Sequence, residues 1–125
     1  MARKITRKGL VKKADTAFSL YIRARDGHQC VLCGSRDMIQ CGHIFSRVAY
    51  STRWDEDNAY AQCASCNMKH EHNAYPFLEW CRKKKGQKKM DELFRKWNST
   101  VKYHDAELEA IAQEYKEKRE HLDKA

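Results

Sequence analysis

Two Cys-x-x-Cys pairs are the most chemically specific feature of the sequence: Cys30 with Cys33, and Cys63 with Cys66. Two residues between cysteines let both thiolates of one turn reach the same ion, and two such turns complete a tetrahedron. A closed site of this kind has no open position for water. We therefore expect one structural zinc ion per chain, in preference to a redox centre.

Three polar residues between and beside these pairs could hydrolyse a phosphodiester: His43, Asn58 and Asn67. A histidine with a pKa near neutral can deprotonate water. A divalent cation on an oxygen ligand can stabilise charge on the phosphate and on the departing oxygen. A second Asn can hold the histidine ring by a hydrogen bond. The set indicates a metal-dependent phosphodiesterase.

The order and spacing of these residues resemble the HNH (ββα-metal) motif of endonucleases, in the variant whose last member is Asn. Several HNH nucleases combine the motif with a Cys₄ zinc site. The resemblance implies that His43 is the general base, that Asn58 orients its ring, and that Asn67 binds one catalytic Mg²⁺ or Mn²⁺.

The chain departs from this motif at one position. Many HNH enzymes carry Asp or Glu immediately before the histidine as a further metal ligand, and here that residue is Gly42. Glu71 follows Asn67 by one helical turn and is a candidate second ligand. His72 and Asn73 are weaker candidates.

Longer stretches at 42–47, 52–58 and 61–67 resemble the NinG family of lambdoid phages, also called Rap. Residues 18–26, 91–93 and 107–108 extend the similarity over nearly the whole chain. The resemblance implies a recombination endonuclease that nicks branched DNA such as Holliday junctions and D-loops.

Other functions stay open at this point. The missing acidic ligand would suit a non-catalytic zinc module that binds DNA or recruits recombination proteins. An HNH nuclease with another DNA or RNA target is a further alternative. Paired nicks in a symmetric junction would suit a homodimer.

The formal net charge of +8 favours a polyanionic partner. Arg47 and Arg53 lie near His43 in the sequence, and we expect them to contact phosphates. A basic run follows farther on, for which a solvated face is as good an explanation as a DNA surface. Its members are Arg82, Lys83, Lys84, Lys85, Lys88 and Lys89. For Trp54, core packing is favoured over a wedge between bases.

The patterning predicts an α+β fold: a small zinc-stapled ββα-metal (HNH) core flanked by an N-terminal helix and C-terminal helices. We divide the chain into a basic arm (1–13), the nuclease core with its preceding helix (14–73) and a helical extension (74–125). The first helix should begin near Asp15 and end at Gly27. A strand over 38–45, a loop over 47–61 ending in a second extended piece, and a helix from Cys63 should follow.

The helical extension should contain three helices. One begins near Pro76, a second follows the break at Gly86, and the last begins near His104. The last helix has an apolar stripe at Leu108, Ile111, Tyr115 and Leu122.

Two cysteines lie outside the Cys-x-x-Cys pairs. Cys81 has helical spacing from Phe77 and Leu78 and should be a core residue, while Cys41 is ambiguous. No apolar segment follows the charged N-terminus, and no apolar run approaches membrane-spanning length. We therefore expect a cytoplasmic protein, in the host cytoplasm if phage-encoded, with no membrane partner.

Overall fold

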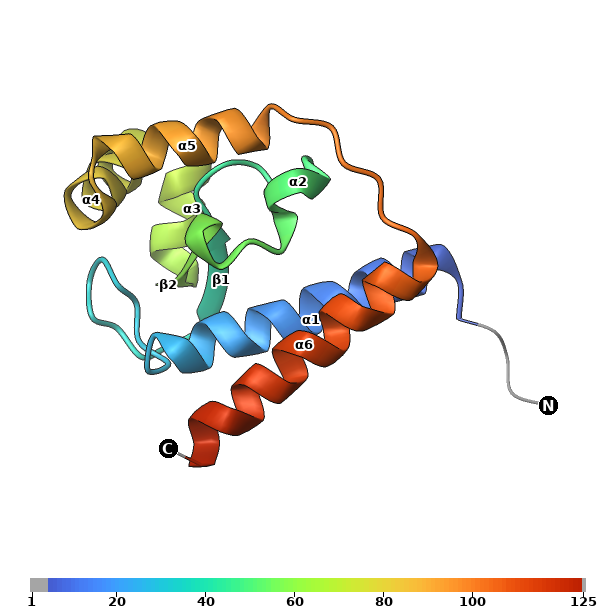
Figure 1. Cartoon of the computed structure of the whole chain (residues 1–125). Coiled ribbons are helices and arrows are strands. Elements are labelled where there is room, and N and C mark those ends of the chain that lie inside the picture. The colour runs from blue at the N-terminus through green and yellow to red at the C-terminus, as the bar shows by residue number, and fades with distance from the viewer. Residues whose placement is uncertain (1–4, 125) are drawn as a thin grey trace.

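The computed structural model describes residues 5–124, which form a mixed α+β fold of six α-helices and a two-stranded sheet (Figure 1). In chain order the elements are α1 (Arg7–Arg25), β1 (Ile39–His43), α2 (Tyr50–Arg53), the 3₁₀ turn η1 (Glu56–Asn58), β2 (Ala59–Cys63), α3 (Ala64–His72), α4 (Tyr75–Lys85), α5 (Gln87–Trp97) and α6 (Asp105–Lys124).

The sheet positions the candidate site. β1 and β2 are antiparallel, with His43 opposite Ala59 and Ile39 opposite Cys63. Because side chains alternate along a strand, Cys41, His43 and Ala59 share the face toward α1, and Gly42, Tyr60 and Gln62 share the other. Both faces are covered, which explains why all five residues of β2 are buried.

Helices α1 and α6 run side by side in the same direction, and α1 packs against one face of the sheet (Figure 1). Phe18 and Tyr115 meet edge to face with ring centroids 5.0 Å apart. Ion pairs of Arg7 with Asp105 and of Lys13 with Glu109 flank the interface. Both pairs are exposed, so apolar burial contributes more to this contact than the charges do.

The predicted start of the first helix is wrong, because the helix begins at Arg7 and not near Asp15. The Thr6 side chain caps it by accepting a hydrogen bond from the N–H of Gly9 at 3.1 Å. Leu10 is 5% exposed because α6 covers it. Most of the predicted basic arm is therefore helical, although residues 1–4 of that arm lie outside the described part of the chain.

Leu108→Ala is expected to lower the free energy of unfolding by about 2–5 kcal/mol, because Leu108 is fully buried between α1 and α6. Chemical denaturation followed by far-UV circular dichroism measures the change. Leu122→Ala on the same helix is the control, since that side chain is 37% exposed. Equal effects of the two substitutions would contradict the packing.

Helices α4 and α5 form a second core against the opposite side of the sheet. Buried Phe77 and Cys81 from α4 meet Met90 and Leu93 from α5, which confirms Cys81 as a core residue. The helices are separated at Gly86, whose φ of +89° is a conformation that favours glycine. The predicted break and the predicted start of α6 are also confirmed.

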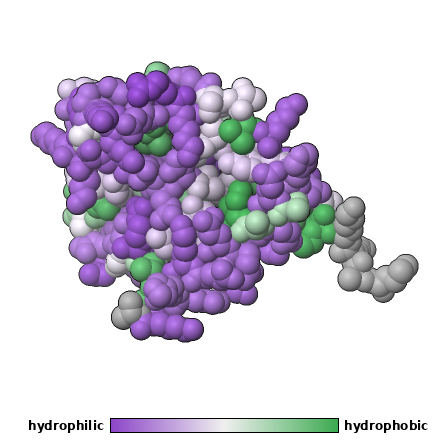
Figure 2. All heavy atoms as spheres, in the orientation of Figure 1, coloured by the Kyte–Doolittle hydropathy of each residue, from purple (hydrophilic) through white to green (hydrophobic). Residues whose placement is uncertain are grey.

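The visible surface is mainly hydrophilic, and hydrophobic residues show as separate patches (Figure 2). Among the described residues, no helix combines the length and the apolar character needed to span a bilayer.

Candidate metal centre and active-site cleft

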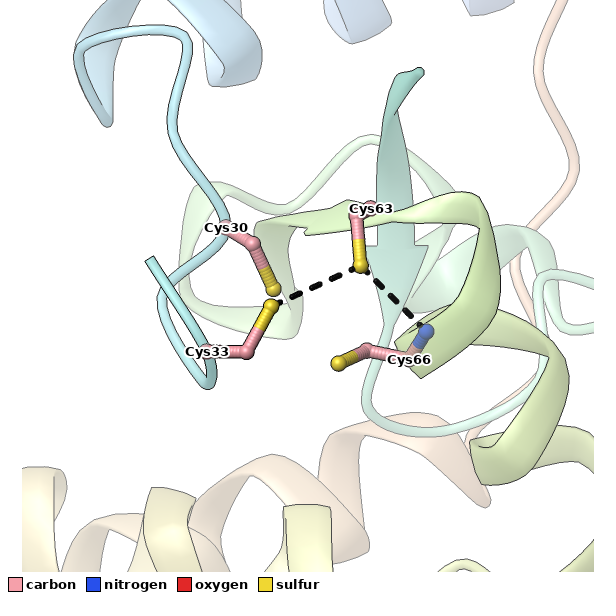
Figure 3. Close-up of side chains that lie close together, drawn as sticks. All are labelled: Cys30, Cys33, Cys63 and Cys66. Atoms are coloured by element: carbon pink, nitrogen blue, oxygen red, sulfur yellow. Dashed lines mark hydrogen bonds between the residues drawn. The ribbon is translucent and has the colours of Figure 1, made fainter. Parts of the chain in front are cut away.

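The two Cys-x-x-Cys pairs converge on one point. The sulfur atoms of Cys30, Cys33, Cys63 and Cys66 all lie within 4.8 Å of one another (Figure 3). The sulfurs of Cys33 and Cys63 are 3.7 Å apart. Tetrahedral zinc with bonds of about 2.3 Å separates its sulfur ligands by roughly 3.8 Å, so this cluster could hold such a structural metal.

Local backbone geometry prepares both halves of the cluster. Gly34 closes the first turn with a φ of +79°, and its N–H donates to the carbonyl of Cys30 at 3.0 Å. In the second half, the Cys63 sulfur accepts from the N–H of Cys66 at 3.5 Å and caps the start of α3. A metal ion held here would therefore also fix where α3 begins.

The surroundings of Cys30 in this cluster favour its thiolate form. Burial opposes ionisation of Cys30, but the backbone N–H groups of Cys63, Cys33 and Leu32 outweigh it and lower the pKa of Cys30 to about 6. The thiolate is the form that binds metal. Cys41 differs: it packs against the α1–α6 core, and burial raises its pKa to about 12. Cys41 is thus a half-buried thiol at the edge of this core.

His43 is the last residue of β1, and its ring is held on two sides. The ring centroid lies 5.8 Å from that of Phe18 in α1, and Nε2 lies 2.9 Å from the carbonyl oxygen of Arg53. Because a carbonyl only accepts, Nε2 must carry the proton. Nδ1 then holds a lone pair, and it makes no hydrogen bond to the described residues. Nδ1 is the atom that can accept a proton from water.

The pKa of His43 is lowered from its usual 6.5. Burial is the main cause, and the positive charges of Arg47 and Arg53 act in the same direction, while the hydrogen bond to the Arg53 carbonyl opposes them. A lowered pKa keeps the ring neutral at physiological pH, which is the state that a general base requires.

Asn58 does not contact the His43 ring by a hydrogen bond, which corrects the role expected for it. It is fully buried, and its Nδ2 donates to the carbonyls of Phe45 at 3.0 Å and Thr52 at 3.1 Å. Its Oδ1 accepts from the N–H of Phe45 at 2.9 Å. Asn58 thus ties the segment after His43 to α2, and the Arg53 carbonyl orients the ring.

Asn58→Ala is expected to reduce the free energy of unfolding by about 3 kcal/mol, because it leaves the N–H and the carbonyl of Phe45 without their partner. Urea denaturation of the zinc-loaded protein would show this. Asn98→Ala is a matched control, since Asn98 is exposed and makes one side-chain hydrogen bond, to the Phe94 carbonyl. A loss below 1 kcal/mol for Asn58→Ala would contradict the role of Asn58 in tying the segment after His43 to α2.

A cleft of about 600 Å³ joins the proposed catalytic residues. His43, Asn67 and Glu71 all line it, although they come from β1 and from two turns of α3. Asn67 is oriented by a hydrogen bond from its Nδ2 to Gln40 Oε1 at 2.9 Å, and its Oδ1 makes no hydrogen bond to the described residues. A hollow of similar size, about 590 Å³, lies between α1 and α6 and contains none of the predicted catalytic or metal residues.

Sequence reasoning missed His70, which lines the same cleft. Its Nε2 lies 3.1 Å from the carbonyl oxygen of His43, so it fixes the backbone at the base itself. Its helical spacing from Asn67, which places it on the same face as Asn67 and Glu71, is the sequence pattern that could have revealed it. The weaker candidates His72 and Asn73 are exposed and do not line the cleft.

The position of Gly42 is filled from the neighbouring strand. A Cβ built on Gly42 would lie 1.8 Å from Oε1 of Gln62 and 3.2 Å from Oδ1 of Asn67. Gln62 is fully buried, and neither of its amide atoms has a hydrogen-bond partner among the described residues. Sequence reasoning did not find Gln62, because only the pairing of β1 with β2 brings it over Gly42.

Arg53 and Trp54 are held by Asp15 of α1. The Arg53 guanidinium pairs with the Asp15 carboxylate through Nη2 at 2.7 Å and Nε at 2.9 Å. Trp54 Nε1 donates to the same carboxylate at 2.9 Å, and its ring is 7% exposed, which confirms core packing. The charge of Arg53 is therefore neutralised within the fold. Its contact with a phosphate stays a prediction, and the phosphate would have to compete with the Asp15 carboxylate for the guanidinium. Arg47 is exposed at the cleft.

The basic run at 82–89 divides into paired and free cations. Arg82 pairs with Glu79, whereas Lys85 and Lys89 lie 3.7 Å and 3.3 Å from the carboxylate of Asp57. Lys85 also lies over the Tyr60 ring. Within residues 5–124, Lys83, Lys84 and Lys88 are exposed and have no acidic partner, so they are the best placed of the run to meet phosphates.

Comparison with known proteins identifies the family. The family model described as Bacteriophage Lambda NinG protein matches residues 2–125. The proteins named ninG of Escherichia phage 933W and Escherichia phage lambda are each 30% identical over 116 residues, and that of Salmonella phage P22 is 31% identical over 119 residues.

These alignments cover 90% of this chain and 56–57% of each relative, so the chain spans little more than half of their length. No solved structure matches the chain. The match to the family model over nearly all residues shows that the chain belongs to the NinG family of phage proteins.

Proposed function

We propose that this chain is a zinc-stabilised, metal-dependent DNA endonuclease of the HNH type. The observation that carries the proposal is the shared cleft, which is lined by His43 at the end of β1 and by Asn67 and Glu71 of α3. A base beside oxygen ligands is the arrangement that single-metal phosphodiester hydrolysis requires. The adjacent Cys₄ cluster would hold zinc and fix α3.

In this proposal each residue of the cleft has a different role. His43 Nδ1 would take a proton from the attacking water, because its ring is held in the required tautomer by the Arg53 carbonyl. Arg47, exposed at the cleft, would bind the phosphate. Asn67 and Glu71 offer hard oxygen donors that fit Mg²⁺ or Mn²⁺. When bound, the ion would neutralise charge on the phosphate and the leaving oxygen.

The substrate in this proposal is branched DNA. The NinG resemblance implies Holliday junctions and D-loops formed during phage recombination. The formal charge of +8 and the free lysines of α4 and α5 support a nucleic-acid partner. Symmetric cutting would need two active sites in opposed orientation, which a homodimer supplies.

A second candidate is a DNA-binding or recruiting module without catalysis. Gly42 favours it, because that position offers no acidic ligand. The two proposals differ in one result, namely whether DNA is cut.

The test incubates the zinc-loaded protein with labelled Holliday junction, D-loop, linear duplex and RNA, in Mg²⁺, Mn²⁺ or EDTA. The proposal expects metal-dependent nicking of the branched DNAs, which Asn67→Ala removes without loss of zinc. Equal cutting of branched and linear DNA would support nuclease activity and refute branch selectivity. Preferred cutting of RNA would mean that RNA, and not branched DNA, is the substrate. Binding without cutting in any metal would make the non-catalytic module the function.

A further inference from the structure

Gln62 is the least expected side chain beside the cleft. It is a polar residue with no exposed surface, and its Oε1 and Nε2 are both without partners among the residues described. Buried amides in folded proteins are almost always hydrogen-bonded. An orphaned one next to a candidate metal site therefore calls for a partner that the chain itself does not supply.

The position of the Gln62 side chain indicates what kind of partner it would take. Gln62 Oε1 lies 1.8 Å from the place that a Cβ of residue 42 would take, and Asn67 Oδ1 lies 3.2 Å from the same place. Two amide oxygens from different elements thus approach one point. Neighbouring oxygen ligands of a hexacoordinate ion with bonds of about 2.1 Å lie roughly 3 Å apart. The two distances above place these oxygens at most about 5 Å from each other, so rotation of the two side chains would bring both to one ion.

We propose that Gln62 is a ligand of the catalytic divalent cation, supplied by β2 in place of the side chain that Gly42 lacks. The inference rests on the proposed function, since it concerns the same metal site. Gly42 is then required, because any side chain there would collide with the Gln62 amide.

The test measures Mn²⁺ binding to the zinc-loaded full chain by electron paramagnetic resonance of the free ion, together with thermal unfolding. Gln62→Leu is expected to weaken Mn²⁺ binding at least about tenfold, the scale on which loss of a residue supporting a metal site acts. Without Mn²⁺ its thermal midpoint should equal or exceed that of the wild type, because an unpaired buried amide is removed.

Thr52→Val is the matched control. Thr52 is also fully buried with an unpartnered side-chain oxygen, but it belongs to α2, and the atoms nearest the Cβ place of residue 42 come from Gln62 and Asn67. Its Mn²⁺ affinity should equal that of the wild type. Gln62→Glu should bind Mn²⁺ more tightly and should gain more thermal stability from the ion than the wild type gains, because a carboxylate replaces a neutral oxygen.

A ligand exchange between strands completes the test. Gly42→Asp with Gln62→Ala should recover Mn²⁺ binding that Gln62→Ala alone loses, because the shortened side chain makes room for a carboxylate at residue 42. Unchanged Mn²⁺ affinity in Gln62→Leu, with affinity lost in Asn67→Ala, would overturn the inference and leave the nuclease standing. A wild type that binds no Mn²⁺ and cuts no DNA would overturn both.

Discussion

Replacing His43 by alanine is expected to lower the rate of DNA cleavage by about 10²–10⁴-fold, the contribution typical of a positioned general base. The reason is geometric: Nε2 donates to the Arg53 carbonyl, so Nδ1 is the ring atom that could accept a proton at the cleft. DNA affinity and zinc content should stay near the wild-type values, since His43 is not among the clustered cysteines. Single-turnover cleavage, fluorescence anisotropy and zinc analysis measure the three quantities.

The pH dependence gives a second readout of the same residue. Protonated His43 cannot accept a proton, so the rate should fall as the pH falls through the pKa of His43. Because burial and Arg47 lower this pKa from 6.5, the acidic limb should lie below pH 6.5. Arg47→Gln should move the limb toward higher pH by removing a positive charge.

His121→Ala is the control for the histidine substitution, because His121 is exposed near the end of α6 and does not line the cleft. Its cleavage rate should match the wild type. If His43→Ala cuts within a factor of about three of the wild type, well below the contribution of a general base, another group is the base.

Removal of zinc is expected to unfold the segment that contains the sheet and α3. Structural zinc in small domains supplies about 10–16 kcal/mol of apparent binding free energy, which is comparable to the whole stability of a domain. Cys63→Ser should be severe, because Cys63 is buried, belongs to the cluster and caps α3. Loss of helical circular dichroism and of the cooperative thermal transition would report the unfolding.

Cys41→Ala separates loss of a metal ligand from loss of a thiol. Cys41 lies outside the cluster, so this variant should keep one zinc per chain and a cooperative transition. Zinc-free protein with an unchanged thermal transition would show that the cysteine cluster is not a structural metal site.

Helix boundaries with local signals could be predicted from the sequence. Gly86 separates α4 from α5, and Pro76 lies in the first turn of α4, as expected. The start of α1 could not be predicted, because a dense run of basic residues hides its apolar face. Leu10 becomes a core residue only when α6, far along the chain, packs against it.

The sequence by itself determined the cysteine cluster and the family, and it predicted the pair of His43 and Asn67, because these rest on residue type and spacing. Only the tertiary structure decided what Asn58, Arg53 and Gln62 do. Asn58 binds backbone groups, Arg53 pairs with Asp15, and Gln62 occupies the space above Gly42. Each of these roles depends on a contact between segments distant in sequence, and strand register and helix packing, which no local pattern encodes, bring those segments together.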